Sequence, residues 1–233
     1  MRNFLIAVAV GLLVFLGFQV FFSWYASILP GLIAFAAAYI VLAQRSMRKV
    51  AALSERAQRE MQAQKPDRAA ETFREGLALA KEQFLVGPLM HANLGMLLYV
   101  QKKFEEARPH LEKGYPRNYV SRAMLACYFF KKQAWEQMER EFETAVKYGK
   151  KDGLIWSLYA YALVQSGQKD KAIQVLSRGV QRNPSDERLK SNLLALQNNK
   201  RMKMRAYGPQ FYQFHLESPP PDFGGRRVIW QRR

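Results

Sequence analysis

The sequence is poor in the side chains that most often carry chemistry. It has one cysteine and three histidines, and 19 acidic residues against 36 lysines and arginines give a formal net charge of +17. A single cysteine, Cys127, excludes an internal disulfide, so packing alone must stabilise the fold. His91, His110 and His215 lack the spacing of metal ligands, and no glycine-rich phosphate loop precedes a predicted helix. We therefore expect no catalytic residue, no metal site and no cofactor.

Charge is also scarce at one end of the chain. Arg2 is the only charged residue among the first 43. Asn3–Phe22 is almost wholly apolar, and at 1.5 Å per residue it spans roughly 30 Å of hydrocarbon. Ser23–Ser27 interrupts it before a second apolar run, Ile28–Ala43. The two runs predict a transmembrane helical hairpin over residues 1–44, with a single span plus a buried helix as the alternative. A cleaved signal peptide would have a shorter apolar run.

Basic residues follow the second apolar run directly. Arg45, Arg48 and Lys49 open a stretch without glycine or proline. We therefore expect the second apolar helix to continue as a basic juxtamembrane helix in the segment 45–66 and to end before Lys65-Pro66. Their position favours an orientation with both chain termini in the cytoplasm. The same charges would also meet anionic lipid headgroups. Orientation and lipid binding need the same residues, and the sequence does not separate them.

One later stretch, Gly153–Pro184, has the spacing of a helix–turn–helix unit of about 34 residues. A small residue in the first helix lets the second helix approach closely, while large residues fill the space around that contact. Gly167 supplies the turn and Pro184 the stop. The spaced positions are Trp156, Tyr159, Ala160 and Leu163, then Ala172, Leu176, Gly179 and Pro184. This order of large and small residues resembles the tetratricopeptide repeat.

The same spacing recurs toward the N-terminus. One copy is centred on Leu94-Gly95 and Phe104–Ala107, and another on Ala126 and Phe142. The earliest copy is partial, with Gly76 in its second helix. We therefore predict an all-α chain in which residues 67–200 form a short solenoid of the tetratricopeptide type. Asp186–Lys200 would be the helix that caps it.

The resemblance implies a concave surface, lined by the first helices, that binds a protein partner. By register it would include an apolar and aromatic set: Met96, Tyr99, Cys127, Phe130, Trp156 and Tyr161. Such a groove suits an apolar helix or an extended segment with aromatic side chains. With so few repeats, internal packing of the same residues is the alternative.

The segment 201–233 forms a basic tail rich in aromatic residues and proline. Its aromatic residues are too many for a solvated tail, so we expect some of them to be buried on the repeats, at the membrane or on a partner. The contact residues are Phe211, Tyr212, Phe214 and Trp230. We expect the first three to pack back on the repeats and the arginine-rich end to bind an acidic partner or lipid.

These features together resemble bacterial inner-membrane repeat scaffolds. The resemblance implies an integral membrane protein, without enzymatic activity or a small-molecule substrate, whose repeats recruit an unidentified protein partner to the cytoplasmic face. The alternative is a surface protein that binds anionic lipid or nucleic acid through the basic helix and tail. Nucleic acid is the less favoured ligand, because no ordered platform of stacking residues accompanies the arginines.

Overall fold

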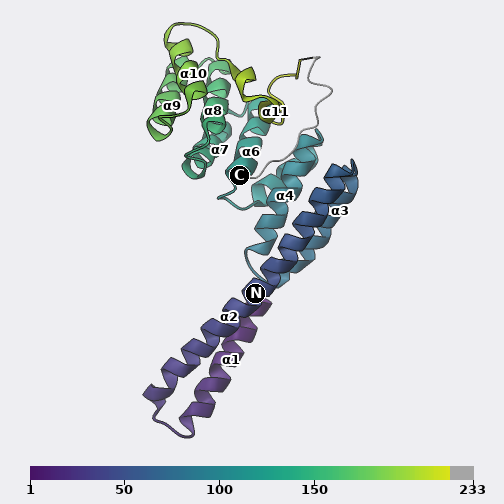
Figure 1. Cartoon of the computed structure of the whole chain (residues 1–233), viewed down its shortest axis with the longest axis vertical. Coiled ribbons are helices and arrows are strands. Elements are labelled where there is room, and N and C mark those ends of the chain that lie inside the picture. The colour runs from purple at the N-terminus through teal and green to yellow at the C-terminus, as the bar shows by residue number, and fades with distance from the viewer. Residues whose placement is uncertain (221–233) are drawn as a thin grey trace. The chain divides into compact units, whose positions relative to one another are not determined.

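The computed structural model describes residues 1–220, and within that range every regular element is a helix. This confirms the all-α prediction. Figure 1 labels the elements. They are α1 (Arg2–Gln19), α2 (Trp24–Gln62), α3 (Pro66–Leu77), η1 (Ala78–Lys81), α4 (Val86–Val100), α5 (Phe104–Lys113), α6 (Tyr119–Lys131), α7 (Trp135–Tyr148), α8 (Gly153–Gln165), α9 (Lys169–Arg182), α10 (Glu187–Gln197), η2 (Met204–Tyr207) and α11 (Pro209–Tyr212).

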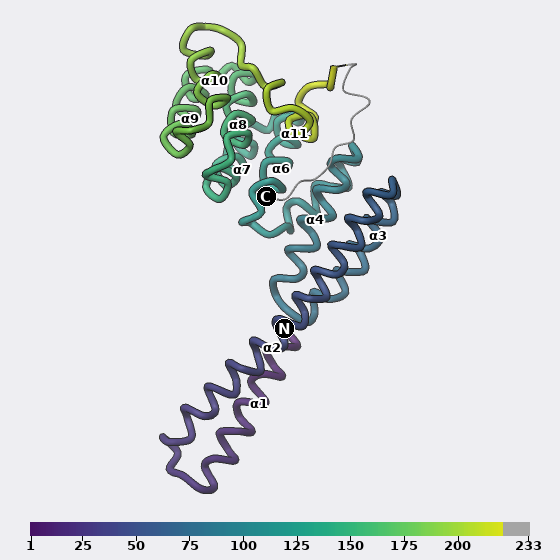
Figure 2. The backbone as a smooth tube through the Cα atoms, in the orientation of Figure 1, coloured from purple at the N-terminus to yellow at the C-terminus, as the bar shows by residue number. Residues whose placement is uncertain are grey.

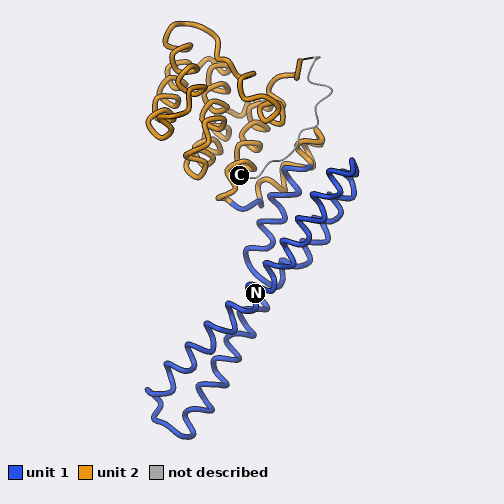
Figure 3. The backbone as a smooth tube through the Cα atoms, in the orientation of Figure 1, with its two compact units in different colours: residues 1–97, 113–115 blue, residues 98–112, 116–233 orange. Residues whose placement is uncertain are grey.

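The chain divides into two compact units (Figure 3). Unit 1 comprises residues 1–97 and 113–115, and unit 2 comprises residues 98–112 and 116–233. The division falls inside α4, so the last turn of that helix belongs to unit 2. Each unit is described by itself below.

Unit 1 begins with a pair of apolar helices, in which α1 runs back along the first part of α2 (Figure 2). Glycines set the closest approach: a Cβ on Gly11 would lie 2.8 Å from the Cβ of Phe35 and 3.0 Å from the carbonyl oxygen of Gly31. Small residues of this kind let helix backbones approach each other closely in membranes. Both helices are long and apolar enough to cross a membrane.

The second helix does not stop where its apolar stretch ends. It continues to Gln62 as one helix of 39 residues, about 58 Å long at the usual rise. Its last part packs against α3, and Ala57 and Ala69 are buried between them. At Gly76 a side chain would collide with Met90, so the missing Cβ allows α3 to approach α4. Residue 44, directly after the apolar run, thus lies inside an unbroken helix, as the continuous helical period predicted.

Unit 2 contains helix pairs with the predicted close contacts. Gly179 of α9 faces Trp156 of α8, and a Cβ on Gly179 would lie 2.9 Å from the indole Cγ. Between the pairs, the rings of Phe142 and Tyr159 stack with centroids 5.1 Å apart. The α10 helix follows α9, and the Asp186 side chain caps its first turn by accepting from the backbone N–H of Leu189 at 3.1 Å. The helix predicted to cap the repeats is therefore present at Glu187–Gln197.

Candidate interaction surface

Residues 203–217, which we call the return segment, run back past α8 to the last turn of α4 (Figure 1). The segment carries η2 and α11 and is connected to α10 by residues 198–202. Asn192 holds its beginning, because its side-chain oxygen accepts from the backbone N–H of Lys203 at 2.7 Å. The segment then makes three successive contacts, with the start of α8, the end of α8 and the last turn of α4.

The first contact is made by Tyr207 at the start of α8. Its hydroxyl lies 2.8 Å from the Ser157 hydroxyl and donates to the Gly153 carbonyl oxygen at 3.2 Å. The guanidinium of Arg188 covers the ring at 4.6 Å from its centroid, a cation–π contact. Burial raises the pKa of Tyr207 to about 12, so the hydroxyl stays protonated. Side chains from α8 and α10 thus hold one tyrosine.

The second contact is made by Phe211, whose side chain is fully buried. Its ring meets the ring of Tyr161 edge-on, with centroids 5.9 Å apart, and lies 5.3 Å from the ring of Tyr212. Tyr212 and Phe214 are also buried. An aromatic side chain buried to this degree behaves as part of a core, and its burial relative to water is worth about 1.5–3 kcal/mol.

The third contact joins the return segment to the end of α4. The Tyr99 hydroxyl donates to the carbonyl oxygen of Phe214 at 2.9 Å, and a ring nitrogen of His215 lies 3.2 Å from the carbonyl oxygen of Val100. The His215 ring also meets the ring of Phe104 edge-on at 5.5 Å. Burial is the main cause of the lowered pKa of His215. The segment is therefore held by directional bonds as well as by apolar burial.

The residues that the sequence assigned to one concave surface have different surroundings in the structure. Tyr99 and Tyr161 contact the return segment, whereas Trp156 packs toward α9 and donates its indole N–H to the Lys150 carbonyl oxygen at 3.0 Å. Cys127 is fully buried, and burial raises the pKa of its thiol. Phe130 is half-buried, with its ring 5.9 Å from that of Trp135.

Two further residues were assigned from sequence, Met96 to the groove and Trp230 to the tail contacts. Met96 is half-buried and belongs to unit 1. Trp230, the last of the expected tail contacts, lies outside the described residues, as does the arginine-rich end of the tail.

Two hollows remain open beside the return segment. The α8 hollow has a volume of about 560 Å³ and is lined by Tyr161 and Glu217 together with three cationic side chains, those of Lys169, Lys200 and Arg201. The α6 hollow has a volume of about 470 Å³ and is lined by Phe104, His215 and Glu217 with two further cationic side chains, those of Lys102 and Lys131. In the described part of the chain, Glu217 is the only acidic residue that lines either hollow.

Glu217 is shared by the two hollows. It lines both hollows and is hydrogen-bonded to the Tyr161 hydroxyl, whose pKa is raised by burial and by this carboxylate. Lys131 lies 4.0 Å above the centroid of the Phe104 ring, and burial lowers its pKa. The return segment thus contacts Tyr99 and Tyr161 of the expected groove and leaves open beside it two hollows with five cationic side chains in their lining.

Unit 1 has a polar cluster around Glu82, in the linker between η1 and α4. The Glu82 carboxylate accepts from Arg2 at 2.8 Å, from Lys49 at 2.8 and 3.1 Å and from the Ser46 hydroxyl at 3.0 Å. The hydrogen bond from Lys49 is the main cause of the lowered pKa of Glu82. Arg45 and Arg48, predicted with Lys49 to meet lipid headgroups, are exposed.

Sequence reasoning missed Glu82, although one signal marks it. It is the only acidic residue between Glu75 and Glu105, within a chain segment that is largely apolar. Among residues 1–220, no group of three or more histidine, cysteine or acidic side chains is arranged to hold a metal ion. The observed arrangement is suited to binding, by charge and by apolar contact.

Comparison with known proteins agrees with this geometry. Two family models described as tetratricopeptide repeat match the chain, one over residues 54–119 and one over residues 154–196. Among solved structures, the chain is similar to "MamA RS-1 ArsTM double mutant", at 16% identity and a TM-score of 0.50, over 72% of this chain and 93% of that one. At that identity the likeness shows the fold alone. No curated protein matches the chain.

Proposed function

We propose that this tetratricopeptide-repeat protein is a membrane-anchored scaffold. Its repeats indicate a scaffold for protein–protein interaction. In this proposal its repeats recruit a partner protein to the cytoplasmic face of the membrane. Restriction to the membrane surface raises the effective concentration of the repeats for any partner that is also held there.

One observation carries the proposal: a single helix belongs to both the apolar hairpin and the repeats. The α2 helix begins at Trp24 in the apolar pair and ends at Gln62, whereas the family match already begins at residue 54. No flexible linker separates a possible membrane span from the first repeat. An anchor built in this way would hold the first repeat close to the membrane surface.

The distribution of basic residues supports the orientation. Arg2 precedes the first apolar helix, and Arg45, Arg48 and Lys49 follow the apolar part of the second, whereas residues 20–23 between the helices contain no lysine or arginine. Loops with an excess of lysine and arginine stay on the cytoplasmic side. Both ends of the hairpin would therefore lie in the cytoplasm, together with the repeats.

The open hollows favour an acidic partner segment. The return segment already contacts Tyr99 and Tyr161 of the expected groove, and the two open hollows beside it present five cationic side chains and the single carboxylate of Glu217. An extended segment rich in aspartate and glutamate complements that charge, and such complementarity chiefly sets specificity and association rate. A purely apolar partner helix would leave these cations unpaired.

Anchorage is tested by fractionation of cells that express the full chain. We expect the chain to stay in the membrane pellet after an alkaline carbonate wash. In inside-out vesicles an external protease should digest the repeats, and in right-side-out vesicles the repeats should be protected. Release by carbonate, or protection in the inside-out vesicles, would contradict the proposed anchorage or its orientation.

Recruitment is tested by recovery of cross-linked partners from detergent-solubilised membranes. The test variant reverses three charges of the α8 hollow (Lys169→Glu, Lys200→Glu and Arg201→Glu). The matched control reverses three exposed charges outside both hollows (Lys147→Glu, Lys151→Glu and Arg182→Glu). We expect the first variant alone to lose its protein partner. Equal loss in both variants would indicate a general charge effect, and recovery of nucleic acid in place of protein would favour the alternative function.

A further inference from the structure

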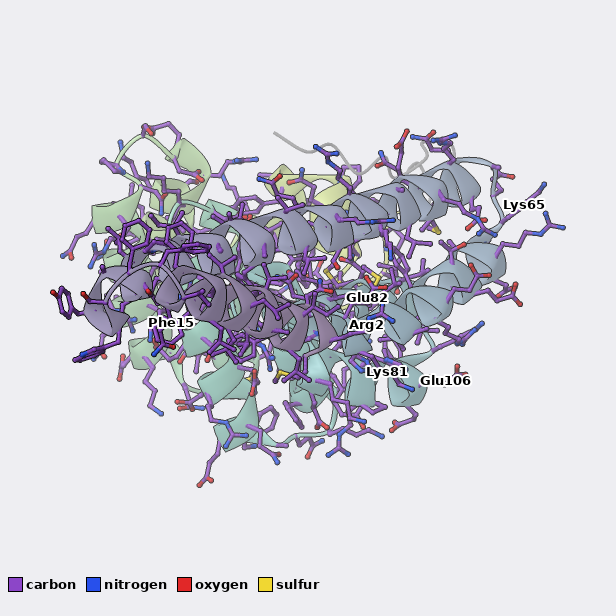
Figure 4. The ribbon with its side chains drawn as sticks, turned by 90° about the horizontal axis from the view of Figure 1, so that it is seen from below. Arg2, Phe15, Lys65, Lys81, Glu82 and Glu106 are labelled. Carbon is purple, nitrogen blue, oxygen red and sulfur yellow. The ribbon has the colours of Figure 1, made fainter. Side chains whose placement is uncertain are left out.

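The linker between η1 and α4, residues 82–85, lies against the polar end of the apolar hairpin. Figure 4 shows Arg2 beside Glu82, with Phe15 farther along α1. Besides the bonds to the Glu82 carboxylate, the backbone N–H of Asn3 donates to the Glu82 carbonyl oxygen at 3.1 Å. The Asn3 side-chain amide donates to the Ser46 hydroxyl at 2.8 Å and to the Leu42 carbonyl oxygen at 3.2 Å. These bonds attach the linker to both hairpin helices.

Beside this polar cluster lies an aromatic pocket of about 410 Å³, formed by Phe4, Phe35, Tyr39 and Phe84 with Met1, Asn3, Glu82 and Gln83. The first three aromatic rings contact one another: Phe4 meets Phe35 edge-on at 5.9 Å, and Phe35 stacks on Tyr39 at 6.2 Å. The fourth, Phe84, comes from the linker and is 56% exposed, while Phe4 is 48% exposed. The pocket is therefore open, and two of the phenylalanine side chains that line it are about half exposed.

The aromatic pocket lies on the apolar side of the polar cluster. Along α2, Tyr39 and Phe35 precede Leu42 by three and seven residues, or about 4.5 and 10.5 Å at the usual helical rise. Along α1, Phe4 lies one residue further into the apolar run than Asn3. If the hairpin spans a membrane, the polar cluster marks the cytoplasmic boundary and the pocket lies just inside it. Phe84 would then reach the depth of hairpin residues.

We infer that the 82–85 linker is a third membrane contact, in which Phe84 enters the interfacial region of the bilayer and the aromatic pocket holds a lipid acyl chain. The inference rests on the proposed membrane anchorage. Aromatic side chains are favoured at the membrane interface, and a half-exposed phenylalanine gains by leaving water. Glu82 does not oppose this placement, because Arg2 and Lys49 pair with its carboxylate.

A lipid is the occupant that the surroundings favour. The pocket is continuous with Phe35 and Tyr39 of an apolar helix whose outward side chains are largely exposed. A protein partner there would have to compete with the same bilayer that covers those side chains. Seating the linker in the interface would also add a second point of attachment for the first repeat, besides α2, and so limit rotation of that repeat about the helix.

The test uses the full chain with an environment-sensitive thiol dye at one position, reconstituted in vesicles of phosphatidylcholine and phosphatidylglycerol. The test variant is Phe84→Cys. Phe4→Cys is the reference inside the apolar run, and Gln62→Cys is the reference on the same helix as Ser46, about 24 Å beyond it along the axis. The native Cys127 is fully buried and stays unlabelled. The readout is loss of fluorescence when some lipids carry a nitroxide close to the headgroup.

We expect the dye at position 84 to lose fluorescence to the same extent as the dye at position 4, and the dye at position 62 to keep it. If position 4 is quenched while position 84 behaves like position 62, the linker lies outside the bilayer and the inference is overturned, but the anchorage stands. If position 4 is not quenched either, the proposed anchorage fails and the inference fails with it.

Discussion

The hydroxyl of Tyr99 donates to the carbonyl oxygen of Phe214 across 2.9 Å, which joins residues 115 positions apart in the chain. Tyr99 lies in the last turn of α4, and Phe214 follows α11 in the return segment. Both side chains are buried. This one bond shows that the surface expected to receive a partner already holds a segment of the same chain.

Replacing Tyr99 with phenylalanine tests that bond. Tyr99→Phe keeps the ring and leaves the buried carbonyl oxygen of Phe214 without its donor, which should lower the free energy of unfolding by about 1–3 kcal/mol. Limited proteolysis should also cut the return segment faster. The control is Tyr148→Phe, because Tyr148 is 39% exposed. Equal behaviour of the two variants would mean that the bond adds nothing to the attachment.

Phe211 tests whether the return segment belongs to the core of unit 2. Its side chain is fully buried, so Phe211→Ala should lower the free energy of unfolding by about 3–5 kcal/mol, through lost burial and the cavity left behind. Leu194→Ala is the control, since Leu194 is 57% exposed and its loss should matter little. The thermal midpoint of the full chain in detergent is the measurement. A small shift for Phe211→Ala would indicate a segment that detaches readily.

Gly179 tests the close contact inside the last repeat. A methyl group there would meet the indole of Trp156 at 2.9 Å, so Gly179→Ala should overpack the α8–α9 contact and lower the free energy of unfolding by about 1–3 kcal/mol. A second substitution, Trp156→Leu, makes room for the methyl group. We therefore expect the double variant to be more stable than the sum of the two single changes predicts. Additive changes would show that the contact is looser than the geometry indicates.

Glu82 should make the stability of unit 1 depend on pH. Its pKa is lowered below the usual 4.5, chiefly by the hydrogen bond from Lys49. A carboxylate with a lower pKa in the folded state stabilises the fold above its unfolded pKa, and this contribution is lost as the pH falls through the folded pKa. The thermal midpoint of the native chain should therefore exceed that of Glu82→Gln most at neutral pH, and the difference should shrink below about pH 4.5.

The control for that titration is Glu136→Gln at an exposed position of α7. Both variants lose one carboxylate, so a difference from the native chain that shrinks at low pH only for Glu82→Gln would identify the cluster around Glu82 as its cause. A constant difference between the native chain and Glu82→Gln over the same range would mean that the charge of Glu82 contributes nothing, and that only its hydrogen-bonding shape matters.

Local patterns account for what could be predicted of the fold. The two apolar runs, the helical period through residues 45–64 and the alternation of large and small residues around Ala160 and Gly179 all lie within one or two turns of helix. Such patterns depend on neighbouring residues only, and the helices and the tetratricopeptide repeats that they predict are confirmed. The end of α2 at Gln62 could likewise be predicted, because Pro66 disfavours helix in the residue before it.

The candidate surface could be predicted only in part. Register alone assigns Trp156 and Tyr161 to one groove, yet the missing Cβ of Gly179 admits Trp156 between α8 and α9, whereas Tyr161 contacts Phe211. Aromatic density indicated that the tail is buried, but nothing in the tail specifies which residues it meets. Glu82 was missed because its partners, three side chains and the backbone N–H of Asn3, come from α1 and α2, far away in the sequence.

The sequence by itself determined that this protein has two apolar helices, a helical repeat architecture and a strongly basic surface, because those properties are set by composition and by spacing within single helices. Only the tertiary structure decided that residues 203–217 contact Tyr99 and Tyr161, that five cationic side chains line the hollows beside them and that Glu82 joins the linker to the hairpin. These features depend on contacts between residues more than 30 positions apart. Which distant groups meet is decided by how whole helices pack, and no local pattern records it.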